Sequence, residues 1–187
     1  MKEKRLNIKG SRIMLVGCLT PIVVIALILI IAALSDASTK NKKKEAAKMV
    51  ADTSLSVEKR VESAAISAVG KKDSNDDSRN IKVKRDGNTA KITLLVGKHF
   101  SSQTAILKMQ KDSVNILKSA QKIKDFEAIA IIWQDKFVDK YGNNSVDDAM
   151  RIFISKQELA KINFKNFNPE NLPKVSYNYY IHPAYLK

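Results

Sequence analysis

The chain has 187 residues, and its 33 Lys and Arg against 19 Asp and Glu give a formal net charge of +14. A single cysteine excludes an intramolecular disulfide, and two histidines with no spacing partner point to neither a metal site nor a catalytic triad. The sequence lacks a phosphate-binding loop, a dinucleotide fingerprint, a paired-cysteine motif and an HExxH motif, so we expect no enzyme, no cofactor and no small-molecule substrate.

An uninterrupted apolar segment, residues 13–34, follows a basic N-terminal tail of residues 1–12. At about 1.5 Å per residue, a helix of this length reaches about 33 Å, which is enough to cross a bilayer core. We therefore expect a single-pass transmembrane signal anchor. Two alternatives stay open: cleavage after the small residues at 32–38, and lipidation of Cys18, although the apolar run follows this cysteine instead of preceding it.

The direction of the anchor depends on the basic residues that flank it. Residues 1–12 and residues 36–50 each contain five Lys or Arg, so the positive-inside count is a tie. Arg12 touches the apolar segment directly, and long C-terminal domains are translocated largely regardless of their charge. We expect the N-terminal tail in the cytoplasm and the domain outside the cell membrane.

A polar linker is expected at residues 35–44, before an extracytoplasmic domain at 45–187. Its three consecutive lysines are candidates for contact with lipid headgroups, at about 1 kcal/mol each on an anionic leaflet. These candidate headgroup contacts are Lys42, Lys43 and Lys44. A plain stop-transfer flank is the alternative interpretation.

The first elements of the domain are predicted from spacing and turn residues. Apolar residues recur at helical spacing through 45–69, where Ser54 or Ser56 suits the start of a helix and Gly70 its end. The polar loop 71–80 resembles the beginning of a calcium loop but lacks the glycine and the glutamate that such a loop needs, so we expect no metal there. Alternation over 81–96 around Asp86-Gly87 predicts a β-hairpin.

The second half of the domain repeats this order. Ser101 or Ser102 begins a predicted helix that extends to Ile123, and residues 126–135 read as a central strand covered on both faces. A turn at 141–144 precedes a strand at 150–154, and the capping box Ser155–Glu158 begins a short helix. The predicted fold class is α+β, in the order helix-β-β-helix-β-β-helix, with a four-stranded, mainly antiparallel sheet.

The tail, residues 163–187, is rich in tyrosine. We expect its rings to pack against the sheet and close the core, because tyrosine combines a large apolar area with a polar tip. The alternative is a partner-binding surface made by Tyr177, Tyr179 and Tyr180.

Four acidic residues flank the predicted turn at 141–144, namely Asp135, Asp139, Asp147 and Asp148. Two facing carboxyl groups can serve as a general acid and base, but acids beside a turn ordinarily form the turn or keep the surface soluble. Trp133 lies in the apolar strand, where a core position is the more common role. We therefore assign no catalytic residue.

The segments IIWQDKFVDKYGN (131–143), KINFKNFNPENLP (161–173) and NYYIHPA (178–184) resemble small uncharacterised proteins of Gram-positive bacteria. Those proteins are typically membrane-anchored or lipoprotein-like, and some are carried on prophages and other mobile elements. The resemblance implies a location in a Gram-positive envelope and supplies no catalytic residues. This chain departs from the lipoprotein-like members because its apolar segment follows Cys18.

Two hypotheses on function follow. Residues 1–12 contribute +4 and residues 13–35 none, so the remainder carries +10 and attracts anionic partners. The preferred hypothesis is a membrane-tethered, non-enzymatic binding or accessory module on the outer face, whose partner is an unknown protein or an anionic envelope polymer. The alternative is a cytoplasmic-facing basic domain that binds nucleic acid or anionic lipid; it is less favoured because the lysines are scattered along the sequence.

Overall fold

The computed structural model describes residues 41, 44–73, 75 and 77–186. The predicted tail and anchor at 1–34, with Cys18, and the lysines at 42 and 43 lie outside the described residues. The chain divides into two compact units, 1–41 and 42–187. Among the described residues, no helix combines the length and apolarity that a membrane crossing requires.

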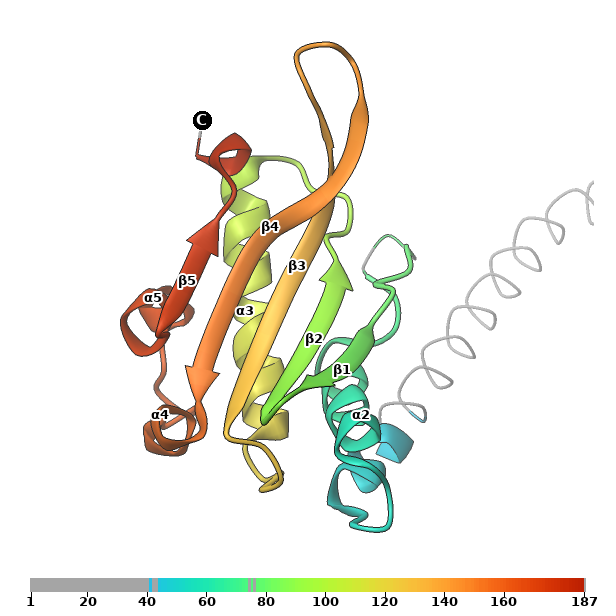
Figure 1. Cartoon of the computed structure of the whole chain (residues 1–187), viewed down its shortest axis with the longest axis vertical. Coiled ribbons are helices and arrows are strands. Elements are labelled where there is room, and N and C mark those ends of the chain that lie inside the picture. The colour runs from blue at the N-terminus through green and yellow to red at the C-terminus, as the bar shows by residue number, and fades with distance from the viewer. Residues whose placement is uncertain (1–40, 42–43, 74, 76, 187) are drawn as a thin grey trace, which may run out of the picture. The chain divides into compact units, whose positions relative to one another are not determined.

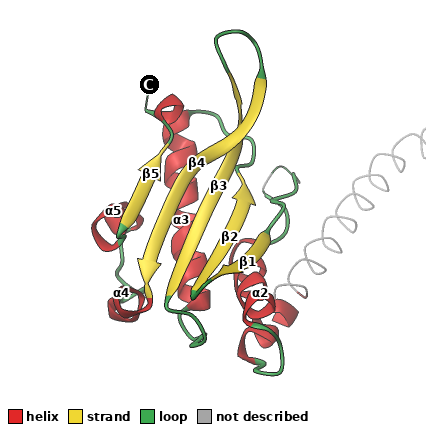
Figure 2. Cartoon of the chain, viewed as in Figure 1, coloured by secondary structure: helices red, strands yellow, loops and turns green. Residues whose placement is uncertain are grey.

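The second unit contains a five-stranded mixed sheet in the order β1-β2-β3-β4-β5 (Figures 1 and 2). Its strands are β1 (Lys82–Asp86), β2 (Thr89–Leu95), β3 (Ala128–Val138), β4 (Asn144–Ser155) and β5 (Asn178–Ile181). Neighbours are antiparallel except for β2 and β3, which are parallel. They are parallel because α3 (Ser102–Ala120) carries the chain back along the sheet between them.

The predicted α+β class is confirmed, but the prediction of four strands is wrong. The tail adds β5 to the edge of the sheet, where Tyr179 pairs with Ile152 and Tyr180 with Arg151. This strand has only a weak signal in the sequence, since only four residues take part and prolines lie close on both sides.

The helices begin where their capping residues predicted. Residues 44–51 are helical, so this segment starts within the range assigned to the linker, and α2 (Val57–Val69) follows after a break. The Ser56 side chain caps α2 by accepting from the backbone N–H of Lys59, and Gly70 ends the helix. Ser101 caps α3 and Ser155 caps α4 (Lys156–Lys161) in the same way. The tail adds the short helices η1 (Pro169–Asn171), α5 (Leu172–Val175) and η2 (Pro183–Tyr185).

The hydrophobic core lies between one face of the sheet and the helices α2 and α3. In Figure 1, α3 lies behind the sheet and follows the line of β3 and β4. Inward side chains of β2, β3 and β4 alternate with outward ones and join the helices in one cluster. Its fully buried members include Ile92, Leu94, Ile131, Trp133, Ile152, Ala64, Ala65, Ile116 and Leu117.

The sequence predicted that the strand at 126–135 is covered on both faces, and the burial of residues 129–133 in β3 confirms this. The main core cluster contains Ile129, Ile131 and Trp133 but neither Ala130 nor Ile132, which point to the other side of the sheet. Ala130 and Ile132 are nevertheless buried, because long side chains from the neighbouring strands flank them on the same face.

A close backbone contact fixes the loop 71–80 against the end of β2. One carboxylate oxygen of Asp73 accepts from the backbone N–H groups of Asn75 and Asp77, at 2.8 and 3.0 Å. The other lies so close to Gly97 that a Cβ atom there would stand 1.7 Å from it. Any larger residue at position 97 would therefore require the Asp73 side chain to move.

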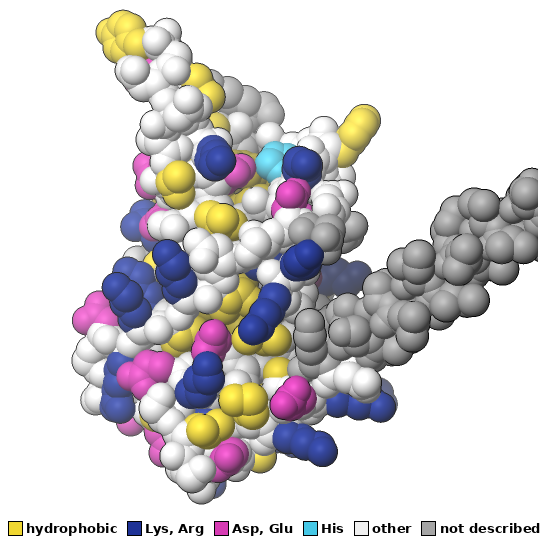
Figure 3. Space-filling view, turned by 90° about the vertical axis from the view of Figure 1, so that its right-hand side faces the viewer, with side chains coloured by type: hydrophobic (Ala, Val, Ile, Leu, Met, Phe, Trp, Pro, Cys, Tyr) yellow, Lys and Arg dark blue, Asp and Glu magenta, His cyan; other side chains and the backbone are white. Residues whose placement is uncertain are grey.

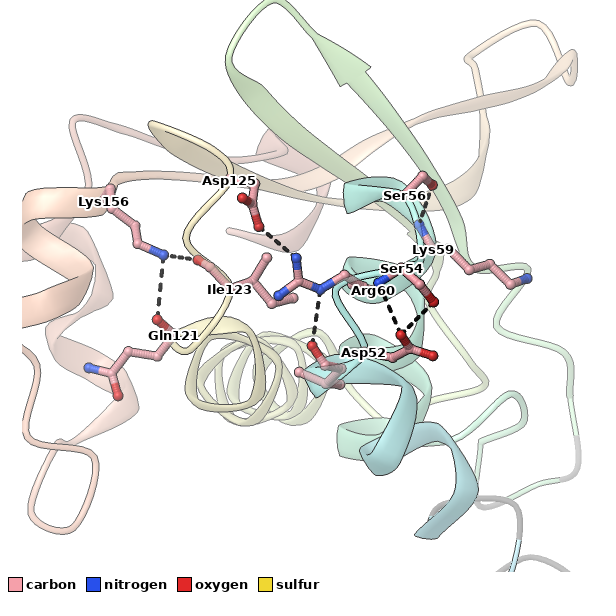
Figure 4. A network of polar contacts seen from close by, with 10 residues as sticks. Asp52, Ser54, Ser56, Lys59, Arg60, Gln121, Ile123, Asp125 and Lys156 are labelled. Atoms are coloured by element: carbon pink, nitrogen blue, oxygen red, sulfur yellow. Dashed lines mark hydrogen bonds and ion pairs between the residues drawn. The ribbon is translucent and has the colours of Figure 1, made fainter.

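A buried arginine joins three segments that are distant in sequence (Figure 4). The Arg60 side chain, from α2, donates through Nε to the carbonyl oxygen of Val50 at 3.2 Å and through Nη1 to the Asp125 carboxylate at 2.6 Å. Arg60 therefore links the helical segment 44–51 with the loop between α3 and β3. Beyond that loop, Lys156 donates to the carbonyl groups of Ile123 and Gln121, and burial lowers its pKa.

The tail closes the core, as its apolar composition predicted. Leu172 is fully buried and Tyr185 is nearly so. Gln121, at the end of α3, donates to the carbonyl oxygen of Leu159 at 3.0 Å and so connects α3 with α4, which precedes the tail. Not every apolar side chain of the tail is covered, since Tyr177 and Leu186 are exposed.

Replacing Ile152 by Ala should lower the free energy of unfolding by about 2–5 kcal/mol, because this side chain is fully buried in the main core. The matched change Ile132→Ala should cost clearly less, although Ile132 is also buried, because the long side chains that flank it on the opposite face can close over the smaller residue. Urea unfolding of residues 42–187, followed by the fluorescence of Trp133, the single tryptophan, measures both. Equal losses would show that the two faces are packed alike.

Candidate functional site

The face of the sheet that points away from α2 and α3 is the candidate site, and we call it the open face. In Figure 1 it is turned toward the viewer, and no described helix lies in front of it. Strand alternation and register assign its residues. They include Lys82, Lys84, Asp86, Lys91, Thr93, Ala130, Ile132, Gln134, Lys136, Val146, Asp148, Arg151, Phe153, Asn178 and Tyr180. We count Tyr177, which precedes β5, as part of the open face because its ring packs against Phe153.

Two rows of paired residues run across the open face from β1 to β5. One row contains Lys82, Thr93, Ile132, Arg151 and Tyr180, and the next contains Lys84, Lys91, Ala130, Phe153 and Asn178. Lysines therefore occupy the half made by β1 and β2, and aromatic rings the half made by β4 and β5. Figure 3 shows the side of the molecule that carries the β1 edge, where Lys and Arg side chains lie among apolar patches.

Two lysines in the lysine half repel each other. Lys84 and Lys91 stand directly opposite each other in the hairpin, and neither forms an ion pair with any described residue. Like charges in this position repel and destabilise the hairpin. Over the whole open face, five cationic side chains face only Asp86 and Asp148, so the surface is clearly positive.

Arg151 lies over a ring in the aromatic half. Its guanidinium carbon stands 4.3 Å from the centre of the Tyr180 ring, which is a cation–π contact. The Nε atom of Arg151 is 3.9 Å from the Asp148 carboxylate and has no hydrogen-bond partner among the described residues. Arg151 is therefore held in place by Tyr180 while part of its donor capacity is unused.

Two further rings complete the aromatic half. Tyr177 packs edge-on against Phe153, with ring centres 5.9 Å apart, and its backbone N–H donates to the Phe153 carbonyl oxygen at 3.0 Å. Phe153 is half-buried, whereas Tyr177 is 63% exposed. An exposed ring that is held by a neighbouring ring offers a flat apolar surface to a ligand.

The structure brings together two of the three tyrosines that the sequence singled out. Tyr177 and Tyr180 belong to the aromatic half, but Tyr179 points to the core side, where its hydroxyl accepts from the side-chain amide of Gln110 at 2.9 Å. Burial raises the pKa of Tyr179. Sequence reasoning missed Phe153, Arg151 and the lysine pair, which the alternation of β2 and β4 could have placed on one face.

The four acidic residues around the β3–β4 turn do not form one acid–base site. Asp135 accepts from the Tyr185 hydroxyl at 2.5 Å, and Asp147, its cross-strand neighbour, accepts from the backbone N–H of Asp148. Asp139 accepts from the side chain and backbone of Asn143 in the turn, which lowers the pKa of Asp139. These contacts stabilise the β3–β4 turn and hold the tail against the sheet.

Neither histidine has a ligand-binding partner in the described part of the chain. His182 stacks on Phe137 with ring centres 4.0 Å apart, and His99 lies 5.6 Å from the Tyr185 ring. No group of three histidine, cysteine or acidic residues that could hold a metal ion occurs among the described residues, the loop at Asp73 included. Of the three candidate headgroup lysines, only Lys44 is described, and it is exposed in the helical segment 44–51.

The Tyr185 hydroxyl makes the stability of the domain depend on pH in the alkaline range. Its burial and the neighbouring Asp135 carboxylate raise its pKa far above the value of about 10 that tyrosine has in an unfolded chain. The unfolded state therefore loses this proton first, and the stabilisation present below about pH 10 is lost as the pH rises further. The Tm of the wild-type domain should fall more steeply between about pH 9 and pH 11 than the Tm of Tyr185→Phe. Parallel curves would contradict the contact with Asp135.

Comparisons of the chain with protein-family models, with curated proteins and with solved structures found no match in any of the three.

Proposed function

We propose that the protein is a membrane-tethered, non-enzymatic binding or accessory module, held in the cell membrane by one span with its domain outside, and that the open face is its binding surface. One observation carries this proposal: unpaired cations and aromatic rings gather on a sheet face that no described helix covers. Exposed rings beside unpaired lysines are typical of a recognition surface and contribute little to a core.

The tether is supported by the apolar segment 13–34 and by the way the domain begins. The helical segment 44–51 is bound to the domain through Arg60, and its Ala46 and Val50 are buried. Only a short stretch of chain therefore separates the predicted anchor from the packed domain.

A non-enzymatic role is supported by the engagement of the reactive groups. The acids of the β3–β4 hairpin hold Tyr185 and the turn, and both histidines contact aromatic rings. The open face itself contains lysines, one arginine and rings, without a nucleophile that hydrogen-bonds to a base among the described residues. Such a surface can hold a ligand, whereas acid–base or nucleophilic chemistry needs a paired site.

The alternative is a cytoplasmic-facing basic domain that binds nucleic acid or anionic lipid. A specific observation favours it more than the sequence did: lysines that are scattered along the chain stand together on the open face. The two functions differ in the side of the membrane on which the domain lies. The resemblance to proteins of Gram-positive bacteria stays a prediction and favours the outer side.

The orientation is tested with a C-terminal tag on the full chain in intact protoplasts. We expect external protease to remove the tag, because long C-terminal domains are translocated largely regardless of charge. A cytoplasmic protein in the same cells serves as the control for leakage. A tag that is cleaved only after lysis would place the domain inside and leave the alternative function.

The binding surface is tested by photo-crosslinking in cells. A photoreactive amino acid replaces Tyr177 on the open face or, as the matched control, Leu107, which is 41% exposed on α3. We expect discrete adducts from position 177 and none from position 107. Equal crosslinking at the two positions, or none at position 177, would overturn the assignment of the open face.

A further inference from the structure

We infer that the open face binds single-stranded nucleic acid, with phosphates at Lys84, Lys91 and Arg151 and with bases stacked at Phe153 and Tyr177. The inference rests on the proposed function only in taking the open face as the binding surface, and it holds for either orientation of the domain. Proteins that bind single strands combine a basic surface along the backbone with aromatic side chains under the bases.

The charge of the face indicates an anionic ligand. Lys84 and Lys91 repel each other across the hairpin, and no described carboxylate pairs with either of them. Lys82 lies two residues further along the same strand face. A phosphate between Lys84 and Lys91 turns the repulsion into two attractions, and a chain of phosphates also reaches Lys82.

Arg151 supplies the second contact for phosphate. Tyr180 holds the guanidinium at 4.3 Å from the ring centre, and Nε is buried there without a hydrogen-bond partner among the described residues. The side chain as a whole is 40% exposed, so its contact with a phosphate is made by the exposed part of the guanidinium. A partly exposed arginine that is held in place beside unpaired lysines fits a phosphodiester better than an isolated carboxylate.

The rings separate nucleic acid from other polyanions. Phe153 and Tyr177 form an edge-to-face pair beside Arg151, and most of the Tyr177 surface is exposed. Every base offers a flat face on which such rings stack, whereas a lipid headgroup or a polyphosphate chain offers none. In a duplex the bases already stack on one another, so the rings select a single strand.

The layout of the open face fits a single strand of nucleic acid whose phosphate backbone lies beside its bases. Lys91 on β2 and Phe153 on β4 flank Ala130 in one row, so two strand spacings, about 10 Å, separate the lysine from the ring. Ala130 itself is fully buried beneath the side chains that flank it, so these flanking side chains form the surface between the lysine and the ring. A backbone that follows β1 and β2 can therefore direct its bases toward β4.

The charge contacts are tested by fluorescence anisotropy of a labelled oligo(dT) with the full chain in detergent micelles. Wild type should bind, and its affinity should fall as the salt concentration rises. In Lys84→Gln/Lys91→Gln, the slope of log K against log salt should shrink by about 0.7, because the two lysines share one phosphate and each lost phosphate contact removes about 0.7. The matched control Lys111→Gln/Lys118→Gln changes two exposed lysines of α3 and should leave the slope unchanged.

The ring contacts are tested with Phe153→Leu and Tyr177→Leu, which keep apolar volume and remove the ring. Each should weaken oligo(dT) binding by about 5- to 150-fold, the range of one lost base stack, and should leave inorganic polyphosphate binding unchanged. Tyr141→Leu, at the exposed tip of the β3–β4 hairpin, is the control and should bind like wild type.

Three outcomes would overturn the inference. Oligo(dT) binding that ignores the ring variants would make the site one for anions in general. Binding to vesicles that contain anionic lipid, through the same lysines and without any affinity for oligo(dT), would make it a membrane contact. Absence of oligo(dT) binding together with crosslinks from position 177 would reject nucleic acid and leave the proposed function intact.

Discussion

Two helices cover one face of a five-stranded sheet, and this one-sided covering decides the rest of the structure. The apolar side chains of β2, β3 and β4 must all point toward α2 and α3, so the alternate positions face away from the core. Those positions are filled mainly by lysines, threonine, arginine and rings, whose polar ends can stay in water while their stems cover Ala130 and Ile132. The open face is thus a product of the same alternation that builds the core.

Local signals predicted the elements well and their pairing poorly. Ser56, Ser101 and Ser155 cap the helices that the sequence assigned to them, because a cap depends on residues within one turn. The parallel pairing of β2 with β3 depends on the path of α3 across the sheet, which no local pattern specifies. The edge strand β5 was missed because a short segment between prolines becomes a strand only when β4 offers its free edge.

The tyrosines of the candidate site could be predicted from the sequence, but the grouping of its cationic residues could not. The cluster at 177–180 was visible as composition, yet strand alternation sends Tyr179 to the core and leaves Tyr180 on the open face. Lys84 and Lys91 are separated by a turn in the sequence, and only the hairpin register makes them neighbours. Arg151 and Tyr180 meet solely because β5 joins the sheet. Surfaces built by register between strands are therefore beyond what spacing along one chain can show.

The hydrogen bond from Arg60 to the carbonyl oxygen of Val50 has a mechanical consequence. With Val50 buried and bound, the segment 44–51 cannot rotate freely against α2. A pulling force that reaches residue 44 is therefore passed through the Arg60 bond into α2 and the core, instead of first unwinding the segment 44–51. Arg60 thereby holds the N-terminal helical segment of the domain rigidly against α2.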